Sequence, residues 1–138
     1  MVVERRYEVS FMFRKILVPV DGSENSYRAL ELALDFAARY GSRVDVLYVE
    51  VGGETEESVR REVLRRAQDR KLDVNFLHKK CDLRTSSVST EILRSIIEGG
   101  YDTVIIGARG KSINEEVGLG STALSVAVNS PTNIIIVR

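Results

Sequence analysis

The sequence contains one cysteine, one histidine, two prolines and no tryptophan. The single cysteine, Cys81, excludes an intramolecular disulfide, and this fits a reducing compartment, so we expect a cytoplasmic protein. Most free cysteines are small buried side chains, and we expect Cys81 to be one, at the end of a strand. The single histidine, His78, is expected at an exposed position or a strand end, so no His/Cys metal cluster and no Ser/His/Asp set is expected.

The sequence also lacks an excess of charge of either sign and any long hydrophobic run. Twenty basic and twenty acidic residues cancel, which argues against a large surface for nucleic acid or membrane. No apolar run reaches the length of a membrane span. Residues 1–13 carry Glu4, Arg5, Arg6 and Glu8 where a signal peptide would have its apolar core, so we expect no signal peptide.

The hydrophobic content is sufficient for one folded domain. The chain has 138 residues, of which 43% are hydrophobic, and this suits a single domain with one sizeable core. Near the N-terminus, Tyr7, Val9 and Phe11 alternate with polar residues, which indicates either a short edge strand or a tail. We therefore expect an N-terminal extension over residues 1–11 and a single domain over residues 12–138.

From residue 15 onward, the sequence alternates between two hydrophobic periods. Short apolar runs typical of strands buried on both faces lie at residues 16–20, 44–49, 74–78, 103–106 and 134–137. The four stretches between them have the apolar spacing of helices. Strands separated by helix-length crossovers pair in parallel through right-handed connections. The sequence therefore predicts an α/β fold with an open, doubly wound, parallel sheet of five strands.

Capping residues mark the ends of these predicted helices. Serine and threonine favour helix starts, because their side chains accept hydrogen bonds from the first backbone N–H groups, and glycine favours helix ends. The expected starts are Ser23, Thr55 and the segment 85–87, and the expected ends are Gly41 and the pair Gly99-Gly100. The last helix is expected over residues 123–128.

A glycine-rich segment carries the strongest chemical signal. The sequence Gly-Ala-Arg-Gly at residues 107–110 follows the fourth predicted strand, and Gly-Ser-Thr at residues 120–122 precedes the last predicted helix. Glycines let the backbone approach an anion closely, and a helix start supplies N–H donors and the positive end of the helix dipole. A strand, a glycine-rich loop and a helix start in this order are typical of a phosphate site.

A second loop with ligand-binding chemistry, Asp21-Gly22-Ser23, follows the first predicted strand. In doubly wound sheets, ligands bind beyond the carboxyl ends of the strands, at the point where the strand order reverses. If the first and fourth strands are neighbours, both loops face one crevice of nucleotide size. Asp21 would then bind ribose hydroxyls or a phosphate-bound Mg²⁺. The alternative is that Asp21 is a turn and helix-cap residue.

Both loops resemble those of the universal stress protein family. The segment 16–23, Ile-Leu-Val-Pro-Val-Asp-Gly-Ser, looks like the first strand of that family. The spacing of Gly107, Gly110, Gly120 and Ser121 is similar to the signature of its ATP-binding branch. The similarity covers residues 12–138, and both motifs fall at their expected elements.

The resemblance implies a three-layer α/β/α fold of the Rossmann-like adenine nucleotide alpha-hydrolase type, with strand order 3-2-1-4-5. It implies a homodimeric, regulatory stress-response protein that holds ATP between the loops after the first and fourth strands, with Mg²⁺ at Asp21. The residues implied to flank the base and ribose are Pro19, Val20, Asp21 and Val49. Those implied to contact the ribose and phosphates are Gly107, Arg109, Gly110, Gly120, Ser121 and Thr122.

Some positions depart from the family pattern. Glu115 and Glu116 lie where the family more often has basic or apolar residues, and they either repel the phosphates or point into solvent. We favour the second, because a buried unpaired carboxylate is costly. Asn133 stands where the family often has a proline. A Walker P-loop is excluded, because it requires a glycine five residues before Gly110 and Ile105 occupies that position.

The last predicted strand indicates self-association. Residues 134–137 are apolar throughout, although the expected topology places this strand at an edge, where exposed apolar groups promote aggregation unless another chain covers them. We therefore expect a homodimer through this strand. No general base is evident beside the phosphate loop, so binding is favoured over turnover. Two alternatives stay open: a slow nucleotide hydrolase that uses Asp21 and Mg²⁺, and a dimeric interaction module whose nucleotide site is vestigial.

Overall fold

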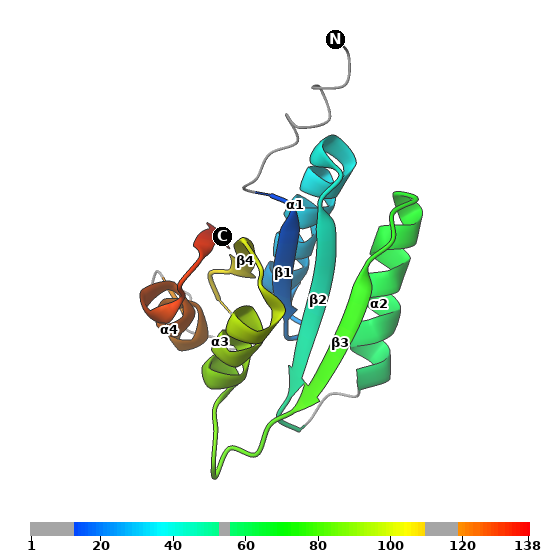
Figure 1. Ribbon diagram of the computed structural model, residues 1–138. Coiled ribbons are helices and arrows are strands. Elements are labelled where there is room, and N and C mark those ends of the chain that lie inside the picture. The colour runs from blue at the N-terminus through cyan, green and yellow to red at the C-terminus, as the bar shows by residue number, and fades with distance from the viewer. Residues whose placement is uncertain (1–12, 53–55, 110–118) are drawn as a thin grey trace.

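The computed structural model describes residues 13–52, 56–109 and 119–138. Within these residues, five strands alternate with four helices (Figure 1). In chain order the elements are β1 (Lys15–Val20), α1 (Glu24–Tyr40), β2 (Arg43–Glu50), α2 (Glu56–Asp69), β3 (Asn75–Lys80), α3 (Val88–Gly99), β4 (Thr103–Gly107), α4 (Ser121–Asn129) and β5 (Asn133–Val137). The predicted succession of strands and helices is therefore confirmed.

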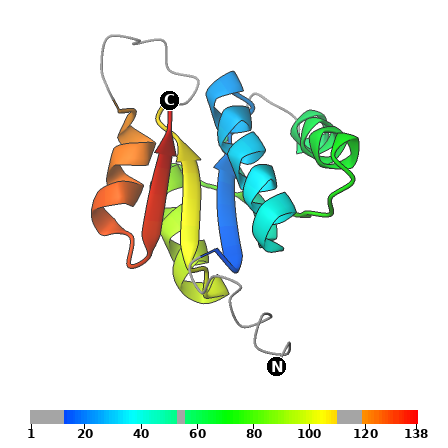
Figure 2. The ribbon, with the colours of Figure 1, turned by 90° about the horizontal axis from the view of Figure 1, so that it is seen from above.

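The strands form one sheet in the order β3-β2-β1-β4-β5, and every neighbouring pair is parallel. Figures 1 and 2 show α1 and α2 on one face of the sheet and α3 and α4 on the other. The chain extends the sheet from β1 to β3 and then returns to β4 on the other side of β1. The predicted open, doubly wound α/β fold is thus confirmed, and its strand order reverses between β1 and β4.

The core consists of two hydrophobic clusters, one on each face of the sheet. Because side chains alternate along a strand, Ile16 and Val18 of β1 pack with α1 and α2, whereas Leu17 packs with α3 and α4. All three are fully buried. Burial on both faces explains why β1 and β4 are unbroken apolar runs without polar alternation.

Ion pairs hold α2 against α1. Its apolar stripe is narrow, with three buried residues, Val59, Val63 and Ala67. Arg66 Nη1 lies 3.3 Å from Glu31 Oε2 of α1, and the Arg66 guanidinium lies 4.8 Å from the centre of the Tyr27 ring. These contacts add charge-assisted hydrogen bonding and cation–π attraction to a small apolar contact.

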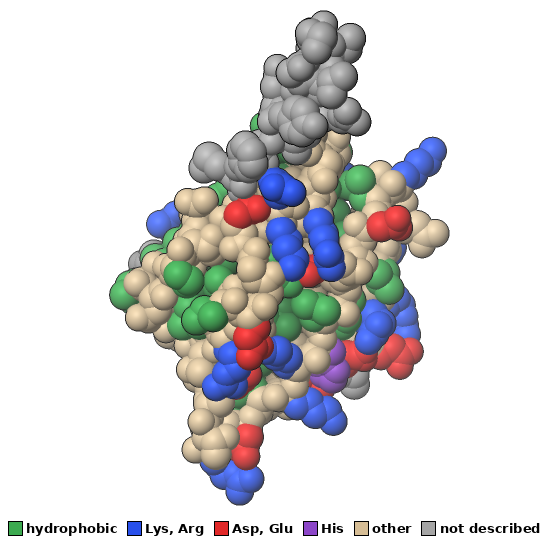
Figure 3. Space-filling view, in the orientation of Figure 1, with side chains coloured by type: hydrophobic (Ala, Val, Ile, Leu, Met, Phe, Trp, Pro, Cys, Tyr) green, Lys and Arg blue, Asp and Glu red, His purple; other side chains and the backbone are tan. Residues whose placement is uncertain are grey.

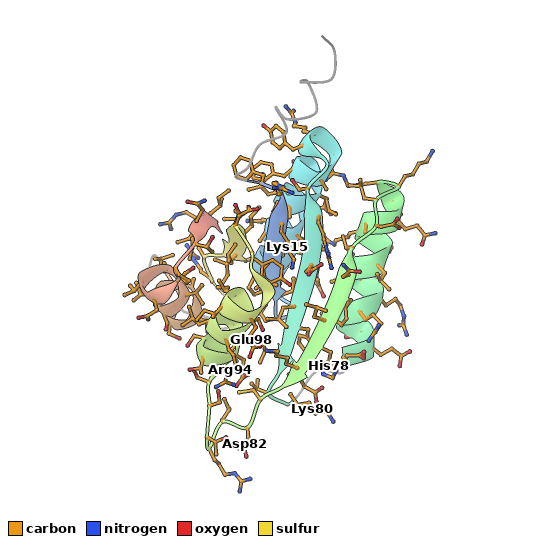
Figure 4. All side chains as sticks on the ribbon, viewed as in Figure 1. Lys15, His78, Lys80, Asp82, Arg94 and Glu98 are labelled. Atoms are coloured by element: carbon orange, nitrogen blue, oxygen red, sulfur yellow. The ribbon has the colours of Figure 1, made fainter. Side chains whose placement is uncertain are left out.

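Several predicted boundaries are corrected by the structure. The third strand begins at Asn75 and continues to Lys80, so His78 lies inside it and not at its end. Figure 4 shows His78 on β3 and Lys80 at the end of that strand. Hydrogen bonds of the β2–β3 ladder extend this strand beyond its apolar residues. The last helix spans Ser121–Asn129 and so begins two residues before the predicted start. The apolar pattern does not indicate this first turn, because it is polar and lines a pocket.

The predicted helix caps at Ser23, Ser87, Gly41 and Gly100 are confirmed. The side chains of Ser23 and Ser87 accept hydrogen bonds from backbone N–H groups in the first turns of α1 and α3. Gly41 and Gly100 have φ angles of 70° and 66°, a left-handed conformation that favours glycine. Thr55 lies outside the described residues. None of the helices in the described part of the chain is long and apolar enough to cross a bilayer.

A buried carboxylate anchors the amino-terminal edge of the sheet. Asp45 of β2 is 4% exposed. Its Oδ2 accepts a hydrogen bond of 2.6 Å from the Tyr101 hydroxyl, and its Oδ1 accepts one of 2.8 Å from Asn75 Nδ2 of β3. Burial and this hydrogen bond raise the pKa of the Tyr101 hydroxyl above its ordinary value. Tyr101 therefore stays protonated and links the end of α3 to β2.

We predict that Tyr101→Phe lowers the free energy of unfolding by about 1–3 kcal/mol, because a buried carboxylate oxygen of Asp45 loses its hydroxyl donor. Urea denaturation measures the change. Tyr40→Phe is the matched control, since Tyr40 is 41% exposed, and it should change stability by less than about 0.5 kcal/mol. Equal losses in the two variants would contradict this role of Asp45.

Candidate functional site

A pocket of about 300 Å³ opens at the carboxyl ends of β1, β2 and β4. Its described lining comes from these three strands, from the loops that follow them, and from α1, α3 and α4. The lining residues are Pro19, Val20, Asp21, Ser26, Leu47, Tyr48, Val49, Val51, Gly52, Val88, Ile92, Ile106, Gly107, Arg109, Gly120, Ser121, Thr122 and Ala123. The pocket therefore lies where the strand order reverses, which is the usual ligand position in such sheets.

The pocket has an apolar side and a polar side. The apolar side comes from β2 and α3, which supply Val49, Val88 and Ile92 among others. The polar side comes from the loop after β1, from β4 and its loop, and from the start of α4. The residues that supply its polar groups are Asp21, Ser26, Arg109, Ser121 and Thr122. Such a division suits a ligand with a flat apolar part and an anionic part.

The start of α4 differs from the starts of α1 and α3. Ser23 and Ser87 cap those two helices with side-chain hydrogen bonds, but the N-cap of α4 is Gly120, which makes no side-chain cap bond. The first N–H groups of a helix have no partner within the helix. At α4 these groups lie at the polar side of the pocket, together with the hydroxyls of Ser121 and Thr122. Such an arrangement of donors at a helix start suits an anion.

Asp21 lines the pocket and also stabilises the turn after β1. Its Oδ1 accepts a hydrogen bond of 2.9 Å from the backbone N–H of Ser23. Its own N–H donates to Ser26 Oγ at 3.3 Å, and Ser26 Oγ donates to the carbonyl of Ser23 at 2.8 Å. The two interpretations offered by the sequence, a turn residue and a pocket residue, therefore apply together.

Hydrogen bonds around Ser86 and Ser87 fix the start of α3 beside the pocket. The Ser86 hydroxyl donates to Glu91 Oε2 at 2.6 Å, and this bond lowers the pKa of Glu91 below its ordinary value. Ser87 Oγ accepts from the backbone N–H of Thr90 at 3.1 Å. Val88 immediately follows this cap and lines the apolar side of the pocket, so the cap fixes its position.

Several backbone N–H groups of the glycine-rich loop donate hydrogen bonds to other residues of the protein. The N–H of Ala108 donates to the carbonyl of Val137 at 2.7 Å, and that of Gly120 donates to the carbonyl of Ala108 at 2.7 Å. The N–H of Arg109 donates to Asn25 Oδ1 at 2.7 Å. Among the described residues, the donors that remain for an anion are therefore those of the first turn of α4 and the side chain of Arg109.

Gly107 is required by a close contact within the protein. A Cβ at this position would lie 2.7 Å from Asn25 Oδ1 and 3.0 Å from the backbone carbonyl atoms of Asn25. The first turn of α1 thus packs directly on the end of β4. The structure shows that this glycine admits the first turn of α1. That it also lets the backbone approach a phosphate stays a prediction.

The structure brings the predicted site residues together. All of them except Gly110 line the pocket, and Gly110, Glu115 and Glu116 lie outside the described residues. Their contacts with a ligand stay predictions. Sequence reasoning missed Asn25, which has no motif or periodicity to indicate its role. It also did not assign Val88 and Ile92 of α3 to the site, because their apolar helical spacing indicates only a buried helix face.

A pocket with one apolar and one polar side, at the reversal point of a doubly wound sheet, is typical of small α/β proteins that hold nucleotides. The model of the "Universal stress protein family" matches residues 12–138 of this chain. The chain therefore belongs to the universal stress protein family.

Individual relatives agree with this assignment. Universal stress protein YxiE of Bacillus subtilis (strain 168) is 26% identical over 149 residues, covering 92% of this chain and 100% of that protein. The structure of universal stress protein UspA from Lactobacillus plantarum matches with a TM-score of 0.76 at 21% identity, covering 94% of this chain and 100% of that one. A universal stress protein in complex with cAMP matches with a TM-score of 0.73 at 23% identity, covering 92% and 98% respectively. These two structures share the fold of this chain.

We predict that Gly107→Ala lowers the free energy of unfolding by about 1–3 kcal/mol, as overpacking does in a tight interior. The new Cβ would displace the Asn25 side chain and press on its backbone. Chemical denaturation without any ligand measures the effect. A change below about 0.5 kcal/mol would show that α1 and β4 tolerate separation, and that Gly107 has no packing role.

Proposed function

We propose that this protein is an ATP-binding regulatory protein of the stress response, and that the pocket at the carboxyl edge binds ATP. The observation that carries the proposal is the start of α4, which has no side-chain cap and lines the polar side of the pocket with two hydroxyls and Arg109. A related universal stress protein was solved in complex with cAMP, which supports a nucleotide in this fold. A cyclic nucleotide is therefore the natural competitor for the same site.

Each part of ATP has a matching surface. The adenine would lie against the apolar side, where Val49 and Ile92 are buried. The ribose would lie near Asp21, whose second carboxylate oxygen is not used in the turn with Ser23. The phosphates would meet the first turn of α4, where the helix dipole and N–H groups favour negative charge. Arg109 adds a charge-assisted donor.

Mg²⁺ fits this arrangement as a companion of the phosphates. Mg²⁺ is commonly held by one or two carboxylates, with phosphate oxygens and water completing its octahedron. Asp21 supplies a carboxylate at the pocket, with one oxygen fixed by Ser23 N–H and the other available. Within the described residues, no group of three or more His, Cys, Asp or Glu side chains forms a metal site. Asp21 would therefore hold the ion only with the nucleotide.

The edge strands favour a homodimer through β5. The open edge of β3 carries His78, Lys79 and Lys80, and charged residues discourage edge pairing. By contrast, β5 has the sequence Asn-Ile-Ile-Ile-Val and is half-buried along most of its length. Figure 3 shows hydrophobic side chains gathered over α3 and α4, and Leu124 and Val128 of α4 are 50% and 71% exposed. A second copy would cover both the edge and part of this surface.

We predict that Ser121→Asp weakens binding of ATP with Mg²⁺ by about 10-fold or more. The carboxylate suits a helix start, so α4 should persist, but it repels phosphate. Isothermal titration calorimetry measures the dissociation constant. Ser89→Asp, in the first turn of α3 and outside the pocket lining, is the matched control and should change affinity less than about threefold.

Equal weakening by the two aspartates would contradict a phosphate position at α4. Absence of ATP binding by the unaltered protein would instead favour the vestigial interaction module. Release of phosphate at a rate lost in Asp21→Ala would favour the slow hydrolase.

We predict that Ile136→Pro converts a dimer into a monomer. The carbonyl of Val137 faces β4, because it accepts from Ala108 N–H, so the N–H of the preceding residue faces the open edge. Proline removes this donor. Analytical ultracentrifugation measures the mass, and circular dichroism checks the fold.

The control is Lys80→Pro on β3. Cys81 N–H donates to the carbonyl of Glu50 of β2, so the N–H of Lys80 also faces outward. A dimer that survives Ile136→Pro, or dissociates equally with Lys80→Pro, would contradict the assignment to β5.

A further inference from the structure

Asn25, in the first turn of α1, joins the glycine-rich loop to the end of β5. Its Oδ1 accepts a hydrogen bond of 2.7 Å from the backbone N–H of Arg109. Its Nδ2 donates to the carbonyl of Val137 at 3.2 Å. The same carbonyl also accepts from the N–H of Ala108 at 2.7 Å. One side-chain amide therefore connects three segments that are far apart in sequence.

The position of Asn25 is fixed from several directions. The missing Cβ of Gly107 leaves the space that Asn25 Oδ1 occupies. Ser26, the next residue, lines the pocket, and its hydroxyl is engaged by Ser23 and Asp21. The first turn of α1 thus contacts the pocket through one residue and the loop through its neighbour. Little rotation of the Asn25 side chain is possible without breaking both of its hydrogen bonds.

This contact determines how Arg109 is presented. A hydrogen bond to the backbone N–H of Arg109 fixes the peptide plane before that residue, and so the position of the Cα from which its side chain leaves the backbone. Arg109 lines the pocket, and it is the cationic side chain among the lining residues. An arginine contributes most to phosphate binding when its guanidinium is held in place before the ligand arrives.

We propose that Asn25 is a positioning residue for the anionic part of the ligand, acting through Arg109. This inference rests on the proposed function, because it requires phosphates at the polar side of the pocket. Asn25 itself does not line the described pocket, so it acts without touching the ligand. Loss of its side chain should therefore weaken the binding of ligands that carry phosphates and leave the binding of a nucleoside without phosphates unchanged.

Calorimetry with ATP·Mg²⁺ and with adenosine, on four forms of the full chain, tests this role. The forms are the unaltered protein, Asn25→Ala, Arg109→Ala and the double variant. We expect Asn25→Ala to weaken the binding of ATP about 10-fold, which is the size of one charge-assisted hydrogen bond. The affinity for adenosine should change less than twofold. In the double variant, the loss should stay within about twofold of that in Arg109→Ala, because residues that act through each other are not additive.

The control is Asn129→Ala, at the exposed end of α4, where the amide donates to the carbonyl of Ser125. It should leave both affinities unchanged. If Asn25→Ala weakens ATP and adenosine equally, its role is structural and the inference is wrong. If its effect adds fully to that of Arg109→Ala, it does not act through Arg109. If the unaltered protein binds neither ligand, the proposed function fails and this inference fails with it. If the unaltered protein binds ATP and Asn25→Ala does not change the affinity, only the inference is overturned.

Discussion

The adjacency of β1 and β4 is the constraint on which the site depends. Ile16 and Leu17 of β1 are in register with Thr103 and Val104 of β4, and both strands are buried on both faces. Parallel pairing brings the carboxyl ends of the two strands to the same edge, so the loop at Asp21 and the glycine-rich loop meet there. The crossover helices then close the pocket, with α3 supplying apolar side chains and α4 an uncapped start.

The same edge shows how packing and function share residues. Gly107 admits the first turn of α1, and this turn supplies Asn25, which occupies a backbone donor of the loop. Residues 107–109 are therefore held by hydrogen bonds within the protein, and among the described residues the donors that remain at the pocket are those of the first turn of α4 and the Arg109 side chain. Backbone that is already hydrogen-bonded needs little rearrangement when a ligand binds.

Much of this structure could be predicted from the sequence, because its signals are local. Unbroken apolar runs at β1 and β4 indicate buried parallel strands, and Ser23, Ser87, Gly41 and Gly100 define helix ends. The pocket residues were found because Asp21 and Ser121 belong to motifs with fixed spacing. Asn25 and the packing role of Gly107 could not be predicted, because they arise from contacts between residues more than eighty positions apart. The end of β3 was misjudged because ladder hydrogen bonds, and not apolar side chains, carry the strand to Lys80.

A crystal structure of the protein with ATP and Mg²⁺ tests the proposed nucleotide site most directly. We expect adenine against Val49 and Ile92, and phosphate oxygens within hydrogen-bond distance of the backbone N–H groups of Ser121 and Thr122. A nucleotide bound with its phosphates away from α4, or a pocket without nucleotide at saturating ATP, would contradict it.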